Sequence, residues 1–393
     1  MRKRQFFTAL AAMAWLGWQA VAARAVEKGC PNAQEADQLL RTASEEMAGA
    51  HYQEVIYQLS GFAVAPCDPR ISLLLAGAYE GNSNIADATR ALESAHDRWP
   101  RNASLAVSLA REYLGRGDIE KAVGALGYFQ TTAETPSQEL EEAALVYIAG
   151  HQLTKAQALA MAAYRRHPTL RSLLLLANTL QLEGRYKDVN TLTAEKRAEY
   201  GGSAAFLITA AESEYDAMIY DAAKKDLEEA VRLDDGSYQA HFLLGNTLMA
   251  QGTMDRAAEE YRKAITLSPN QPRTYYQLAL VARARQDEAE EEKLLQQTLA
   301  VDDHYAPAYC EQGRILLDRH ELKGAVDRLN LAIQYNAQNE QAYYMLARAY
   351  AESGEKEKSR AMVKEYTKIR AANRQSSPDT HPGQVGASGT ATP

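Results

Sequence analysis

The sequence predicts an all-α protein, an α-solenoid in which antiparallel helix hairpins stack along the chain. The first observation is that a small residue recurs ten times at intervals of 33 or 34 residues. Its positions are Ala43, Ala76, Ala110, Ala144, Ala177, Ala211, Gly245, Ala279, Gly313 and Ala347. The second observation is that two further columns, 12 and 16 residues after the first, hold mostly Ala and mostly Leu. Three columns in one period indicate a repeated structural unit.

Proline positions are a third observation. Nine of the twelve prolines fall at the predicted unit boundaries, where a missing backbone N–H does not interrupt a helix. They are Pro31, Pro66, Pro69, Pro100, Pro136, Pro168, Pro269, Pro272 and Pro307. Proline is not part of the three repeat columns, so its positions support the same division into units independently.

The seventh unit shows the pattern most completely. Seven of its residues occupy the signature positions of one repeat family: Gly245, Leu248, Gly252, Ala257, Tyr261, Ala264 and Pro269. The chain resembles the tetratricopeptide repeat (TPR) family over ten units, from about Ala36 to Asn373. The resemblance implies two antiparallel helices, A and B, in each unit of 34 residues, with helix A lining a concave surface. Small residues let the two helices approach closely.

The first 25 residues have the pattern of an export signal. Arg2, Lys3 and Arg4 form a positive head, a 12-residue apolar run extends from Phe6, and a small-x-small site ends at Ala25. A bilayer-spanning helix needs about 20 apolar residues. We therefore expect cleavage after Ala25 and a periplasmic or secreted protein of bacterial type, with no membrane span after cleavage; retention as an anchor stays the alternative.

The remaining chain is expected to divide into residues 26–35 as a lead-in, 36–200 as units one to five, 201–373 as units six to ten and 374–393 as a disordered tail. The fifth unit departs from the pattern, since Thr193 and Lys196 replace Leu and Ala and two glycines follow at Gly201. We interpret this unit as a loosened joint. Glu291 occupies a normally small, buried position, so either its helix is rotated outward or the register shifts there.

Two of the three cysteines flank the first predicted hairpin. Cys30 precedes its first helix and Cys67 follows its second, so an antiparallel arrangement would bring them together. In an oxidising compartment they could form a disulfide, with two unpaired thiols as the alternative. Cys310 is expected to be a small packing residue.

Composition and motifs exclude several function classes. A net charge of −8 argues against a nucleic-acid partner, because nucleic-acid binders usually carry a strongly basic face. The sequence contains no Cys-x-x-Cys, no phosphate loop and no Gly-x-Ser-x-Gly. We expect no enzymatic activity, no metal site and no cofactor.

Positions on helix A predict where a ligand would bind. In the resembled family the groove is lined chiefly by the residues three before and one after the small position. In the second half of this chain those positions and their neighbours combine aromatic side chains with Arg and Asn. The candidate peptide-binding residues are Phe242, Asn246, Arg273, Tyr276, Arg283, Arg314, Tyr344 and Arg348. Arginine forks pair with carboxylates and tyrosines supply rigid contact area, so the ligand is expected to be an acidic or C-terminal peptide.

The sequence thus predicts a non-catalytic scaffold or adaptor in the bacterial cell envelope that binds a protein or peptide in its groove. A self-associating structural solenoid is the main alternative, and an enzyme with an unrecognised site is a further one. The oligomeric state and the identity of the partner stay open.

Overall fold

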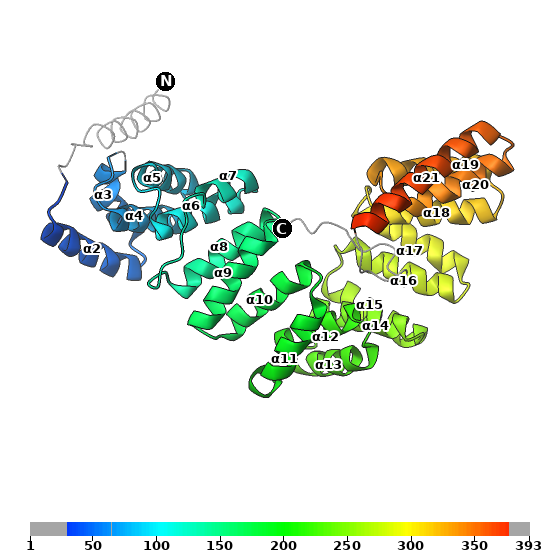
Figure 1. Cartoon of the computed structure of the whole chain (residues 1–393), viewed down its shortest axis with the longest axis horizontal. Helices are drawn as coiled ribbons and strands as arrows, with labels where there is room; N and C mark the ends of the chain where they lie inside the picture. The colour runs from blue at the N-terminus through cyan, green and yellow to red at the C-terminus, as the bar shows by residue number, and fades with distance from the viewer. Residues whose placement is uncertain (1–29, 64, 377–393) are drawn as a thin grey trace, which may run out of the picture. The chain divides into compact units, whose positions relative to one another are not determined.

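The computed structural model describes residues 30–63 and 65–376, and every regular element among them is a helix (Figure 1). The all-α prediction is confirmed. The predicted export signal, residues 1–25, lies outside the described residues, as do residues 377–393 of the predicted tail. The chain divides into two compact units whose boundary falls between Arg185 and Tyr186.

The first unit contains four consecutive hairpins and one further helix. Its helices are α2 (Ala33–Ala48), α3 (Tyr52–Leu59), the short 3-10 helix η1 (Ser60–Phe62), α4 (Pro69–Gly81), α5 (Ile85–Arg98), α6 (Ala103–Gly115), α7 (Ile119–Ala125), α8 (Ser137–Ala149), α9 (Leu153–Arg166) and α10 (Leu170–Leu182).

The second unit begins with α11 and continues through five hairpins. Its helices are α11 (Tyr186–Tyr200), α12 (Ala204–Asp216), α13 (Tyr220–Leu233), α14 (Tyr238–Ala250), α15 (Met254–Leu267), α16 (Pro272–Ala284), α17 (Glu288–Val301), α18 (Ala306–Asp318), α19 (Leu322–Tyr335), α20 (Glu340–Glu352) and α21 (Lys356–Ser376). Even-numbered helices are helices A of the repeats and odd-numbered ones are helices B.

The recurring small residues allow helices A and B to pack tightly. A Cβ added at Gly245 would lie 2.6 Å from the ring of Tyr261, and one added at Gly313 would lie 2.6 Å from the side chain of Leu329. Tyr261 and Leu329 belong to the third sequence column, and both are fully buried. The first and third columns therefore meet in the core of each hairpin.

The turn between helices A and B has the same backbone conformation throughout. One residue with positive φ occurs in each of the ten turns: Ala50, Ser83, Gly117, His151, Gly184, Met218, Gly252, Gln286, His320 and Gly354. Six of the ten are not glycine, although a side chain disfavours this left-handed region. The closing geometry of the hairpin thus overrides local preference in those six turns.

The boundary of the compact units falls one helix earlier than the predicted division at residue 200. It separates α10 from α11, which are the two predicted helices of the fifth repeat. Thr193 of α11 is buried, and its hydroxyl donates to the carbonyl of Val189 instead of filling the core as leucine would. At the other end, α21 continues to Ser376, so its last three residues lie within the predicted tail.

The position of Glu291 matches neither predicted alternative, an outward rotation of its helix or a shift in register. It lies in α17 with 3% of its surface exposed, so the helix is not rotated outward and the register holds. The carboxylate is tolerated at this small-residue position because an arginine of the next repeat pairs with it.

A disulfide joins Cys30 and Cys67, whose Cα atoms lie 5.4 Å apart. Cys30 directly precedes the N-cap region of α2, and Cys67 lies just before α4. The bond therefore ties the start of the first hairpin to the start of the second. Cys310 is free and buried, and burial raises the pKa of its thiol to about 12.

Candidate functional site

The eight candidate residues lie on four helices A of the second unit: α14, α16, α18 and α20. Neighbouring pairs among these helices are in contact, α14 with α16 and α18 with α20. We call the surface that the helices A of this unit present the helix-A face. The structure divides the candidates into an aromatic group near α14 and α16 and an ionic group near α18 and α20.

Arg273 of α16 lies over the aromatic side chains of α14. Its guanidinium carbon is 4.4 Å from the ring centroid of Phe242 and 5.5 Å from that of Tyr238. The Nε atom donates to the Tyr238 hydroxyl over 3.1 Å, and the two rings stack with centroids 5.8 Å apart. Cation–π contacts and one hydrogen bond therefore fix the orientation of the guanidinium while Arg273 stays exposed.

The helix starts explain why these side chains meet. Ser237 caps α14, so Tyr238 is its first residue and Phe242 follows one turn later on the same side. Pro272 begins α16, which places Arg273 in the first turn. The hydroxyl of buried Thr274 lies 2.8 Å from the Tyr238 hydroxyl and holds that ring between the two helices.

Arg273 differs from the other candidate arginines in its charge partners. Among the described residues no carboxylate oxygen lies within 4.0 Å of its guanidinium. The charge of Arg273 affects the pKa of Glu212 in α12, the residue after the small position of the sixth repeat. Burial raises the pKa of Glu212 and Asp216 raises it further, whereas the charge of Arg273 opposes the rise.

Asn246 and Tyr276 lie in the same group but make internal contacts. The Asn246 side-chain oxygen accepts a hydrogen bond of 2.7 Å from the Tyr261 hydroxyl. The Tyr276 ring packs against Tyr305 at a centroid distance of 5.5 Å, and burial raises the pKa of Tyr276. Burial also raises the pKa of Tyr305, to about 12. Tyr276 and Tyr305 thus form an aromatic pair, and the charge of Arg273 is close enough to oppose the rise in the pKa of Tyr305.

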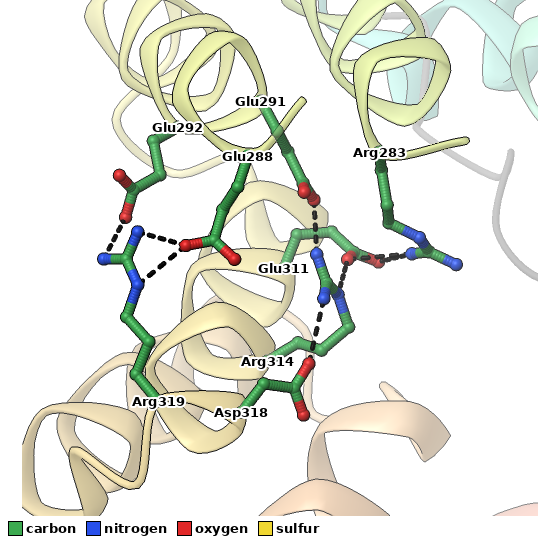
Figure 2. A network of polar contacts seen from close by, with 8 residues as sticks. All are labelled: Arg283, Glu288, Glu291, Glu292, Glu311, Arg314, Asp318 and Arg319. Carbon is green, nitrogen blue, oxygen red and sulfur yellow. Dashed lines mark hydrogen bonds and ion pairs between the residues drawn. The ribbon is translucent and has the colours of Figure 1, made fainter. Parts of the chain in front are cut away.

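The second arginine group is an ion-pair network (Figure 2). Arg283 Nη1 lies 2.9 Å from both carboxylate oxygens of Glu311. Arg314 contacts Glu311 over 2.7 Å, Glu291 over 2.5 Å and Asp318 over 3.1 Å. Glu291 and Glu311 are 3% and 2% exposed. Figure 2 shows Arg314 pointing between these acids, so its charge is directed into the protein.

Arg348 and Tyr344 of α20 lie beyond this network. Arg348 pairs with Glu352 over 2.8 Å and with Asp318 over 3.5 Å. Tyr344 is 57% exposed and its ring lies 5.7 Å from that of Tyr366 in α21. Arg283, Arg314 and Arg348 therefore differ from Arg273, because each of them already has a carboxylate partner.

Tyr238, Tyr305 and Glu311 contact the candidate residues although they were not among those predicted. For two of the three, the spacing to a candidate residue in the sequence indicates the contact. Tyr238 lies four residues before Phe242, and Glu311 lies three residues before Arg314, and both spacings place side chains together on a helix. Tyr305, at the N-cap of α18, has no candidate residue three or four positions away in the sequence.

One group among the described residues has ligand atoms close enough for a metal ion: Asp302, Asp303 and His304, within 4.8 Å of one another. The His304 ring packs edge-on against Tyr335, and its Nδ1 already contacts Asp303 over 2.5 Å. We assign no metal to it. Within the described part of the chain no helix combines the length and apolar character needed to cross a membrane.

Comparison with known proteins identifies the repeat. Two segments, residues 208–272 and 316–376, match family models described as tetratricopeptide repeats. A cell division cycle protein 27 homolog of Caenorhabditis elegans is 42% identical over 55 residues, which are 14% of this chain and 7% of that protein.

Three solved structures illustrate the similarity of fold. A tetratricopeptide repeat protein of Parabacteroides merdae has 16% identity and a TM-score of 0.47, over 62% of this chain and 98% of its own. The Cut9–Hcn1 tetramer has 12% identity and a TM-score of 0.41, over 84% and 86%. YrrB, described as having an unusual peptide-binding site, has 18% identity and a TM-score of 0.36, over 46% and 92%. With its sequence period, its helix hairpins and its two matched segments, the chain is a tetratricopeptide repeat protein.

Proposed function

We propose that this protein is a non-catalytic adaptor of the bacterial cell envelope that binds an acidic or C-terminal peptide segment at Arg273. Repeats of this family form protein-interaction scaffolds. The observation that carries the proposal is the guanidinium of Arg273, which stacks on Phe242 and has no carboxylate within 4.0 Å among the described residues.

The geometry around Arg273 suits a carboxylate ligand. A guanidinium presents its N–H groups as a planar fork that matches the two oxygens of a carboxylate. Stacking on Phe242 and bonding to Tyr238 restrict the side chain before a ligand arrives, so less conformational entropy is lost on binding. Tyr276 and Tyr305 add rigid aromatic area beside it.

The export setting is supported by two features of the sequence and structure. The N-terminal pattern is that of a cleaved signal, and the Cys30–Cys67 disulfide is typical of an oxidising compartment. Both fit a periplasmic location.

Affinity capture with two matched variants tests the proposal. The chain from Val26 onward would be incubated with an extract of exported proteins from the host, and captured proteins identified by mass spectrometry. Arg273→Glu should abolish capture of the specific partner, whereas Arg262→Glu, which makes the same charge change at an exposed position of α15, should not. Capture that survives Arg273→Glu would contradict the proposal.

A further inference from the structure

The last helix that the structure describes, α21, is strongly basic although the chain as a whole is acidic. Helix α21 contains seven Lys and Arg residues and two Glu, whereas the whole chain has a net charge of −8. It is 21 residues long, against 14 for the equivalent helix α19 of the preceding repeat. Positive charge is therefore concentrated at one end of the repeat array.

Four of these cations have no ion pair among the described residues and are exposed: Lys356, Arg360, Lys364 and Arg374. Their spacing by multiples of about 3.6 residues places them on one side of the helix, over a length of about 27 Å. Lys356, Arg360 and Lys364 also follow one another at i, i+4, and like charges in that arrangement disfavour a helix. Glu357 lies three residues before Arg360, but no ion pair joins these two side chains in the described part of the chain.

The same side of the helix has a different role in the preceding repeat. In α19, Leu322 and Val326 pack in a cluster with Met345 and Ala349 of the following helix α20. The residues 34 positions later in α21 are Lys356 and Arg360. This side of α21 is therefore the surface on which a further helix A would pack.

Apolar side chains are exposed in the middle of this surface. Val363 is 50% exposed, whereas its equivalent Leu329 is fully buried. Tyr344 of α20 is 57% exposed, whereas its equivalent Cys310 is 3% exposed and lies beside Asn339 of the following repeat. We call the surface formed by Tyr344, Lys356, Arg360, Val363, Lys364 and Arg374 the basic end face.

We propose that the basic end face binds an acidic, amphipathic helix of a partner protein. A helix is the element that occupies the equivalent surface of the inner repeats, and apolar residues on it would cover Val363 and Tyr344. Acidic residues on its flanks would pair with the row of cations, since residues four apart have the same rise of about 6 Å on both helices.

Two other occupants fit less well. A second copy of this chain would present the outer side of α2, where Arg41 takes the place of Met345 and would face Lys356 and Arg360. Residues 377–393 contain one acidic residue and three prolines, a composition that does not supply an acidic helix. The favoured occupant is therefore a separate protein.

Titration with synthetic probes tests this inference. The probe is a peptide of about 20 residues in which Leu occupies one helical face and Glu both flanks; its matched control has the same composition with the Leu positions scrambled. The wild-type chain should bind the amphipathic peptide at least about tenfold more tightly than the scrambled one, and added salt should weaken the binding. Equal binding of both peptides, or binding of neither, would overturn the proposal.

Charge-reversal variants locate the site. Lys356→Glu, Arg360→Glu and Lys364→Glu together should weaken peptide binding by about tenfold or more. The control variant carries the same charge change at exposed residues elsewhere, as Arg101→Glu, Lys225→Glu and Lys323→Glu, and should bind as the wild type does. Arg273→Glu should also leave this binding intact, which separates it from the proposed peptide site.

Further binding and sedimentation measurements would detect a different occupant of the basic end face. Vesicles of phosphatidylglycerol or a single-stranded oligonucleotide that bound as tightly as the peptide, with the same loss in the triple variant, would show a general polyanion surface and overturn the proposal. Sedimentation that showed self-association abolished by the triple variant would instead assign the surface to a second copy and overturn it as well.

Discussion

Arg314 of the ninth repeat reaches back to Glu291 of the eighth, and its Nη2 lies 2.5 Å from the Glu291 carboxylate. The carboxylate is almost completely buried at a position where six of the ten repeats have alanine. The same guanidinium holds buried Glu311 over 2.7 Å. One arginine therefore pairs with two buried acids at the junction between two repeats.

Removing this arginine should strongly destabilise the second unit. Arg314→Leu would leave Glu291 without a partner and Glu311 with Arg283 alone, so the free energy of unfolding should fall by about 3–5 kcal/mol. Urea denaturation followed by circular dichroism measures the loss.

The matched variant is Glu291→Ala, which restores the residue typical of this position in other repeats. Because Arg314 keeps Glu311 and Asp318, its cost should be no more than about 1 kcal/mol. Equal costs for the two variants would contradict the role assigned to Arg314.

Glu214 should make stability depend on pH. Burial raises the pKa of this carboxyl to about 7, Asp226 adds to the rise, and Arg197 opposes it. Because the folded state then holds a proton that the unfolded state releases near its ordinary pKa of 4.5, this group's contribution is complete below about pH 4.5. It is lost as the pH rises through about 7.

Glu214→Gln removes this titration. The variant should be more stable than the wild type by roughly 1–3 kcal/mol at about pH 8, after allowance for screening by solvent, and closer to it at about pH 5. Unfolding free energies measured across this range provide the check. If the unfolding free energies of the two proteins changed with pH in parallel, Glu214 would not be the cause of the pH dependence.

Substitutions at equivalent positions of two hairpin turns should change the free energy of unfolding in opposite directions. Gly252 has φ 76° and Met218 has φ 62° in the same turn of consecutive repeats. Gly252→Ala should destabilise by about 1 kcal/mol, because a Cβ disfavours this region.

Met218→Gly should be neutral or stabilise by up to about 1 kcal/mol, since Met218 is 44% exposed and loses little packing. Thermal denaturation of both variants tests the pair. A destabilised Met218→Gly protein would indicate that the methionine side chain contributes more than its backbone strain costs.

The repeat architecture could be predicted from the sequence because the same small position recurs ten times. At Gly245 and Gly313 the small residue meets a large one 16 positions later, Tyr261 and Leu329, so the period itself encodes the hairpin. The six non-glycine turns were not predictable, because their conformation is set by the closure of the hairpin and not by local preference.

The candidate site was only partly predictable for a related reason. Helical position indicates which face Arg273 and Arg314 share, but not which charges neighbouring helices bring to it. Glu291 comes from α17, the helix before that of Arg314, and pairs with Arg314, whereas Arg273 meets the rings of α14. Such pairings depend on the offset between repeats, which a single sequence does not specify.

The most direct test of the central claim is a binding cycle at Arg273. The acidic segment of the captured partner would be titrated calorimetrically, with its carboxylates intact and replaced by amides, against the wild type and Arg273→Ala. Amide replacement should weaken binding to the wild type by about 1.5–3 kcal/mol and to Arg273→Ala far less, because the charged hydrogen bond is then already absent. Equal losses in both proteins would show that Arg273 does not bind the carboxylate, and would contradict the account.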